Sequence, residues 1–74
     1  MEIKVGIQHV NREVVVETTE TAADVERAFS DAVENQGVFT LSDERGRRVL
    51  IPSTKIAYVD LGEEHARKVG FGTL

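Results

Sequence analysis

Apolar and polar residues alternate along the first part of the chain, as in a β-strand with one buried face. The apolar positions that recur at a spacing of two are Ile3, Val5 and Ile7, then Val14 and Val16. We expect a β-hairpin over residues 3–18, with its turn around Val10-Asn11-Arg12 and Asn11 in a left-handed conformation. Val15 points to the opposite face and is flanked there by Glu13 and Glu17.

The following segment has a helical period. Thr21 can cap a helix, with Asp24 placed to bond back in a variant of the capping box, and the helix should end near Asn35. Gly37 sits where a left-handed residue would end it. Spacings of three and four then define one apolar stripe that must lie against a sheet, formed by Ala22, Val25, Ala28, Phe29, Ala32 and Val33.

A second hairpin and a final strand follow the helix. Strands over residues 38–42 and 47–51 are joined by Asp43-Glu44-Arg45-Gly46, in which Gly46 supplies a positive φ. Pro52 cannot donate to a ladder, so the chain should bend through Pro52-Ser53-Thr54 before a fifth strand over residues 55–61. Residues 63–69 favour one or two helical turns, and the glycine-rich end makes residues 63–74 a flexible C-terminal segment.

These elements predict a single small α+β domain over residues 1–74. The order ββαβββ gives two layers: a hairpin, one helix, then a three-stranded antiparallel meander, with the helix packed on one face of an antiparallel sheet. The composition, 41% hydrophobic and 30% charged, is that of a folded protein. There is no cysteine to stabilise so short a chain, so packing and association must do so.

One helix covers only one face of such a sheet, and apolar residues remain on the other. Those expected there are Val15, Val38 and Leu50, with either Ile56 and Tyr58 or Ala57 and Val59. An exposed apolar face usually marks a contact surface, so we expect a homodimer or a protein partner. The alternative is that the C-terminal segment folds over this face, with Val69 and Phe71 as a lid. Val15, Val38, Leu50 and Phe71 are the candidate interface residues.

The charge is unevenly distributed. The chain has a net charge of −4, and residues 17–34 carry six acids against Arg27. Residues 45–55 carry the opposite charge, through Arg45, Arg47, Arg48 and Lys55. Arginines beside a turn can bind phosphate, so these four residues are a candidate nucleotide or nucleic-acid site, to which Tyr58 is added as a polar or interfacial residue. Against this, two acids adjoin the cluster and no aromatic residue interleaves it.

No pattern for enzymatic chemistry is present. The chain has no phosphate-binding loop of the Walker type, no nucleophile with a nearby base, and only two separated histidines, His9 and His65. We therefore predict no enzyme, no metal site and no cofactor. The N-terminus lacks an apolar signal region and no apolar run approaches the roughly 20 residues of a membrane span. This predicts a cytoplasmic protein that does not bind membranes.

Three segments resemble one known family: Asp43-Glu44-Arg45-Gly46-Arg47-Arg48, Lys55-Ile56-Ala57-Tyr58-Val59-Asp60-Leu61-Gly62 and Ala66-Arg67-Lys68-Val69-Gly70-Phe71-Gly72. It is the actinobacterial family of small proteins catalogued as domain of unknown function 3107. The resemblance implies a cytoplasmic protein without an established activity, although some members carry an ATP-binding label. We expect a non-enzymatic interaction module that self-associates or docks a protein. The alternative is phosphate binding through the basic hairpin.

Overall fold

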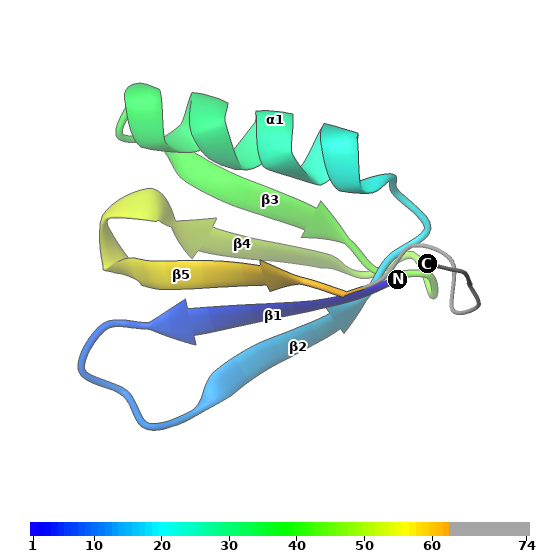
Figure 1. Cartoon of the computed structure of the whole chain (residues 1–74), viewed down its shortest axis with the longest axis horizontal. Helices are drawn as coiled ribbons and strands as arrows, with labels where there is room; N and C mark the ends of the chain where they lie inside the picture. The colour runs from blue at the N-terminus through cyan, green and yellow to red at the C-terminus, as the bar shows by residue number, and fades with distance from the viewer. Residues whose placement is uncertain (63–74) are drawn as a thin grey trace, which may run out of the picture.

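The computed structural model describes residues 1–62 of the chain (Figure 1). The regular elements, in order, are β1 (Glu2–Ile7), β2 (Glu13–Glu17), α1 (Ala22–Glu34), β3 (Val38–Ser42), β4 (Arg48–Pro52), the short 3₁₀ helix η1 (Ser53–Lys55) and β5 (Ile56–Leu61). All five predicted strands and the predicted helix are present, with bounds close to those expected. The predicted helical turns over residues 63–69, the flexible C-terminal segment and Phe71 lie outside the described residues.

The strands form two antiparallel sheets rather than one. β1 lies between β2 and β5 in a three-stranded sheet, and β3 pairs with β4 in a two-stranded sheet. The α+β class is confirmed, but the predicted meander in a single sheet is wrong, because β5 pairs with β1 and not with β4. The chain changes sheet within η1. The Ser53 N–H still donates to the Gly37 carbonyl at the start of β3 (2.9 Å), whereas the Lys55 carbonyl accepts from Gln8, just after β1 (2.8 Å).

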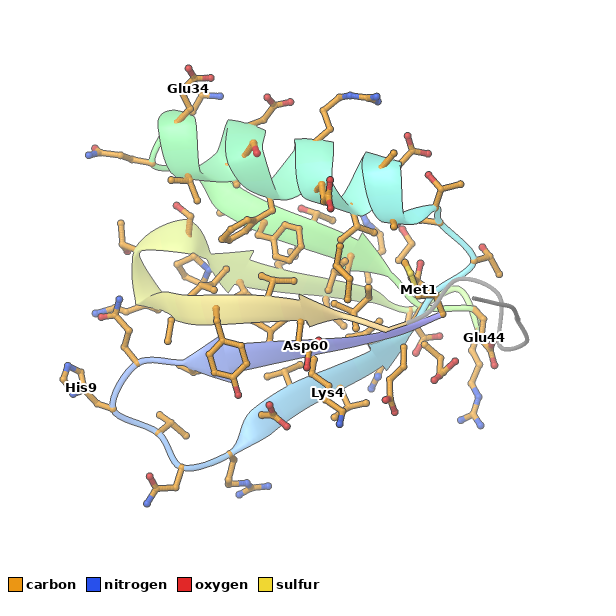
Figure 2. The ribbon with its side chains drawn as sticks, in the orientation of Figure 1. Met1, Lys4, His9, Glu34, Glu44 and Asp60 are labelled. Carbon is orange, nitrogen blue, oxygen red and sulfur yellow. The ribbon has the colours of Figure 1, made fainter. Side chains whose placement is uncertain are left out.

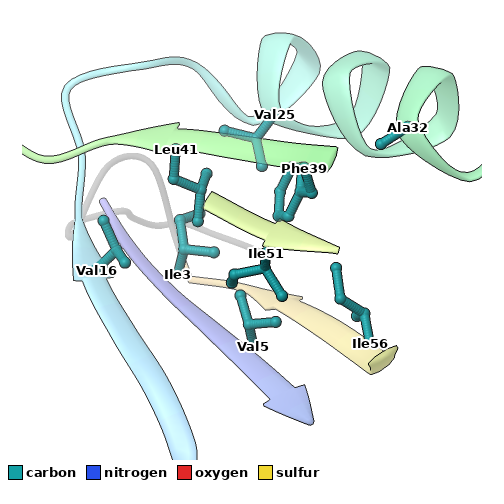
Figure 3. Close-up of a cluster of buried hydrophobic side chains, with 9 residues drawn as sticks. All are labelled: Ile3, Val5, Val16, Val25, Ala32, Phe39, Leu41, Ile51 and Ile56. Atoms are coloured by element: carbon teal, nitrogen blue, oxygen red, sulfur yellow. The ribbon is translucent and has the colours of Figure 1, made fainter. Parts of the chain in front are cut away.

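Both sheets turn one face toward a shared core (Figure 3). Its buried side chains come from all five strands and the helix: Ile3, Val5, Val16, Val25, Ala32, Phe39, Leu41, Ile51 and Ile56. The helix packs mainly on β3, where the Phe29 and Phe39 rings meet edge to face with centroids 5.4 Å apart. The predicted arrangement, in which one helix covers one face of a five-stranded sheet, is therefore replaced by two sheets and a helix around one core. The described part of the chain consequently has two outer sheet faces instead of one.

Strand β5 does not keep a strict alternation. Its pairing with β1 shifts register between Gly6 and Ile7, so that Tyr58 pairs with Gly6 but Ile56 pairs with Ile7. The irregularity buries Ile56 and leaves Tyr58 exposed. Neither predicted pair, Ile56 with Tyr58 or Ala57 with Val59, therefore shares the outer face. Bulges of this kind are set by tertiary pairing and leave no mark on the hydrophobic pattern.

The turns lie where the local sequence predicted them, but in two of them a different residue takes the left-handed conformation. The Thr21 side chain caps α1 as predicted, accepting from the Asp24 N–H (3.1 Å), and Gly46 takes a positive φ of 87°. In the first hairpin, however, the left-handed residue is His9 and not Asn11. At the helix end it is Gln36 and not Gly37. There the Gly37 N–H donates to the Ala32 carbonyl (2.8 Å) and the Gln36 N–H to Val33 (3.2 Å), which is a Schellman ending one residue earlier than expected.

Candidate interaction surfaces

The outer side of the β3 and β4 pair carries exposed apolar side chains. The register places Val38 opposite Pro52 and Thr40 opposite Leu50, all on the side away from the core residue Phe39. Val38 is 55% exposed and Leu50 is 60% exposed. We call Val38, Thr40, Leu50 and Pro52 the hairpin face. Because strand residues alternate between faces, burying Phe39, Leu41 and Ile51 forces these four residues outward.

The outer face of the three-stranded sheet carries charged as well as apolar side chains. Val15 is 48% exposed there, but it pairs with Lys4 and lies between Glu13 and Glu17 on its own strand. Figure 2 shows Lys4 and Asp60 together on this face, and the two residues pair in the register of β1 and β5. The expectation that Val15 shares one uncovered face with Val38 and Leu50 is therefore wrong, because they belong to different sheets.

The basic turn between β3 and β4 is organised by Asp43. Its carboxylate accepts from the Arg45 N–H and pairs with the Arg47 guanidinium (Oδ2 to Nη2, 3.3 Å), while its carbonyl accepts from the Gly46 N–H (2.9 Å). The Asp43 side chain is only 10% exposed. Asp43 is one of the two acids that argued against a phosphate site, yet it is the residue that organises this turn. Its charge also partly neutralises that of Arg47. Arg45 and Arg48 make no ion pair with any residue that the structure describes.

The five candidate binding residues do not lie in one place. Arg45, Arg47 and Arg48 lie at the turn end of β4, whereas Lys55 follows the other end of that strand. The Lys55 carbonyl bonds to Gln8, beside the first hairpin turn. Figure 2 shows these two ends of the molecule, with His9 at one and Glu44 at the other. Tyr58 lies on the outer face of the three-stranded sheet. Sequence proximity suggested one cluster, but a strand separates its members.

Tyr58 makes a defined contact that the sequence did not indicate. Its ring lies over Gly6, where an added Cβ would come within 2.2 Å of the ring, and its hydroxyl donates to the Glu13 carboxylate. That hydrogen bond, together with partial desolvation and the negative charges of Glu13 and Asp60, raises the pKa of Tyr58 above its usual 10.0. The phenol therefore stays protonated at neutral pH. Tyr58 and Glu13 also line a hollow of about 380 Å³, together with Val10, Asn11 and Arg12.

An apolar groove lies between α1 and β5. It has a volume of about 150 Å³ and is lined by Val25, Glu26 and Phe29 from the helix and by Val59 and Leu61 from the strand. The sequence pattern placed Phe29 in the apolar stripe of the helix, but not beside the last strand. The helix and β5 are more than twenty residues apart in the sequence, so no local pattern could have revealed the groove.

Over residues 1–62 the structure holds no group of three or more acidic or histidine side chains that could share a metal ion. Within that range no helix is long and apolar enough to cross a membrane. His65 lies outside the described residues.

The fold and these surfaces define a small α+β protein that has, over residues 1–62, two antiparallel sheets, one helix and apolar side chains left outside the core. No curated protein matches the chain. A family model matches residues 1–72, and the chain belongs to that family, described as "Protein of unknown function (DUF3107)". The family named from the sequence motifs is therefore confirmed. Its description assigns no activity.

Proposed function

We propose that this protein is a non-enzymatic interaction module that self-associates through the hairpin face. The observation that carries the proposal is the exposure of Val38 and Leu50 on the outer side of β3 and β4. Burying such side chains is favourable by about 25 cal/mol per Å² of apolar surface. The centre of the face carries no charged side chain, and Arg48 lies at one end of it. A charge-free centre with a charged rim is the usual layout of a contact surface.

A second copy of the chain fits this face because a two-fold axis would not bring like charges together. If the two hairpins cross antiparallel, Arg48 of one copy lies near the Val38 and Pro52 end of the other. A patch two strands wide and about 17 Å long is, however, well below the roughly 800 Å² per partner of a stable interface. We therefore expect weak association that depends on protein concentration.

Phosphate binding by the basic turn is the alternative, and the contacts of the turn support it less well. The N–H groups of Arg45 and Gly46 already donate to Asp43, and the Arg47 side chain pairs with the same residue. Lys55 lies at the far end of β4. Only Arg45 and Arg48 would be left to hold a phosphate group, without backbone donors of the turn to assist them.

Sedimentation equilibrium from micromolar to millimolar protein tests the proposal. We expect the wild-type mass to rise with concentration, and the Leu50→Lys variant to stay monomeric because a charge would be buried at the contact. Val10→Lys is the matched control. Val10 is also an exposed valine (50%) but lies in the first hairpin turn, and this variant should associate like the wild type.

Three outcomes would contradict the proposal. The first is a wild type that stays monomeric at the highest concentration. The second is loss of association in Val15→Lys but not in Leu50→Lys, which would move the contact to the other sheet. The third is a set of NMR shifts at Arg45 and Arg48 on adding ATP, lost at high salt and unaccompanied by self-association, which would favour the phosphate alternative.

A further inference from the structure

The helix covers only part of the core-facing side of the sheets. Figure 1 shows α1 lying along β3, with β4 between β3 and β5. In the register of β5 and β1, Val59 lies opposite Val5 and Leu61 lies opposite Ile3, two residues of the buried core. Val59 and Leu61 therefore face the core, yet both are only partly buried. The groove between α1 and β5 is core-facing apolar surface that the helix leaves uncovered, on the opposite side of the sheets from the hairpin face.

Two hollows along the helix set the size and shape of what can enter. The groove itself holds about 150 Å³, enough for a group the size of benzene. A second hollow follows it along α1 and is lined by Phe29, Ser30, Val33 and Glu34. The two hollows share Phe29, and their helical linings are offset by about four residues, which is roughly 6 Å or one helical turn. Two apolar side chains one turn apart on a partner helix would fill both.

The border of these hollows is acidic. Glu26 lines the first hollow and Glu34 lines the second. Both side chains are exposed, and over residues 1–62 neither forms an ion pair. Arg27, the basic residue of α1, already pairs with Asp24 (3.3 Å). No basic side chain of the described residues lines either hollow, so the border carries uncompensated negative charge.

This charge decides between the kinds of occupant. The phosphate groups of a nucleic acid or of anionic lipids would be repelled. The helix of a second copy would be repelled as well, because it carries the same four acids. A small polycation would gain nothing from the apolar walls of the groove. The occupant that fits both the walls and the border is a polypeptide that combines apolar with basic side chains.

We infer that this groove docks a basic amphipathic helix of another protein. Apolar side chains at positions i and i+4 of that helix enter the two hollows, in the helix-in-groove mode of recognition. Lysine or arginine side chains beside them pair with Glu26 and Glu34. These two acids lie about 12 Å apart along α1, so they select basic residues about two turns apart on the partner. The docking surface is separate from the hairpin face and does not depend on self-association.

Methyl NMR of the full-length protein, titrated with a synthetic peptide, tests the inference. The peptide is a helix of about 14 residues with leucine on one face and lysine on the other. We expect its addition to shift the methyl signals of Val25, Val59 and Leu61, which line the groove, and not those of Val38 or Leu50. Two control peptides should not bind: one in which glutamine replaces leucine, and one in which glutamate replaces lysine.

Two charge reversals on α1 separate the groove from the overall charge of the protein. Glu26→Lys should weaken peptide binding by roughly fivefold or more, because an attractive pair becomes a repulsive one. Asp31→Lys is the matched control and should bind like the wild type. It changes the net charge equally, but Asp31 lines neither hollow and lies about 140° from Glu26 around the helix. Leu50→Lys should also bind the peptide normally, so a failure of docking and a failure of self-association can be told apart.

Four results of these titrations would overturn the inference. They are no shifts in the wild type at millimolar peptide concentration, equal binding by Glu26→Lys and Asp31→Lys, binding of either control peptide as tight as that of the basic peptide, and shifts confined to the hairpin face. The free protein gives a fifth test. Nuclear Overhauser contacts between the methyl groups of Val59 or Leu61 and residues 63–74 would contradict the inference, because the occupant of the groove would then belong to the same chain.

Discussion

At the scale of single residues, Tyr58 shows how one side chain compensates for a glycine. Gly6 lies in the central strand of the three-stranded sheet and has no side chain to cover its neighbours. The Tyr58 ring from the adjacent strand fills that space and its hydroxyl bonds to Glu13 on the far strand. One side chain therefore reaches across all three strands. Such aromatic cover of a strand glycine also fixes the register between the strands.

The titration of this tyrosine gives a direct test of the contact. Tyr58 is the only tyrosine in the chain, so tyrosinate absorbance reports it alone. The neighbouring carboxylate favours the protonated phenol, so the wild type should titrate above pH 10.0. Glu13→Ala should lower the pKa toward 10.0. Glu17→Ala removes another acid from the same strand and should leave the pKa where it is. Equal pKa values in all three proteins would show that the hydrogen bond is absent in solution.

At the scale of elements, α1 is bounded by signals that its own sequence carries. Thr21 begins it through a side-chain hydrogen bond to the Asp24 N–H, and the Gln36 and Gly37 N–H groups end it by bonding its last carbonyls. Asp24, in the first turn, also interacts favourably with the positive end of the helix dipole. The helix was therefore predictable from local sequence, and the left-handed residue at its end was displaced by only one position.

Removal of the helix cap should lower the stability of the whole molecule. Thr21→Ala should reduce the free energy of unfolding by about 1 kcal/mol, because the Asp24 N–H loses its acceptor. Urea unfolding followed by far-UV circular dichroism should show a lower midpoint with an unchanged slope. Thr19→Ala, at an exposed position just before the cap, should leave the midpoint nearly unaltered. An equal shift for both variants would mean that the cap makes no contribution.

At the scale of the whole molecule, two small sheets depend on one core. The two-stranded sheet contributes Phe39, Leu41 and Ile51 to it, and the three-stranded sheet contributes Ile3, Val5, Val16 and Ile56. A two-stranded sheet is marginal by itself in water, so neither sheet should persist once the shared core is lost. We therefore expect the protein to unfold in a single cooperative transition.

Matched substitutions on the two sheets test this cooperativity. Ile3→Val and Ile51→Val should each lower the free energy of unfolding by about 0.5 to 1.5 kcal/mol. In each variant, the unfolding midpoint measured from the circular dichroism of the helix and the midpoint measured from Tyr58 fluorescence should shift together. Val15→Ala, at an exposed position, is the control and should change stability by less than about 0.5 kcal/mol. Separate transitions for the two probes would show that the sheets fold independently.

The sequence by itself determined the strands, the helix, the cap at Thr21 and the glycine turn at Gly46, because each depends on residues near one another along the chain. It also determined the family, through motifs that span most of its length. Only the tertiary structure decided that β5 pairs with β1, that Val15 and Leu50 lie on different sheets, and that Lys55 lies far from Arg45. Strand pairing joins residues more than fifty positions apart, and alternation records which side of a strand is apolar but not which neighbour covers it.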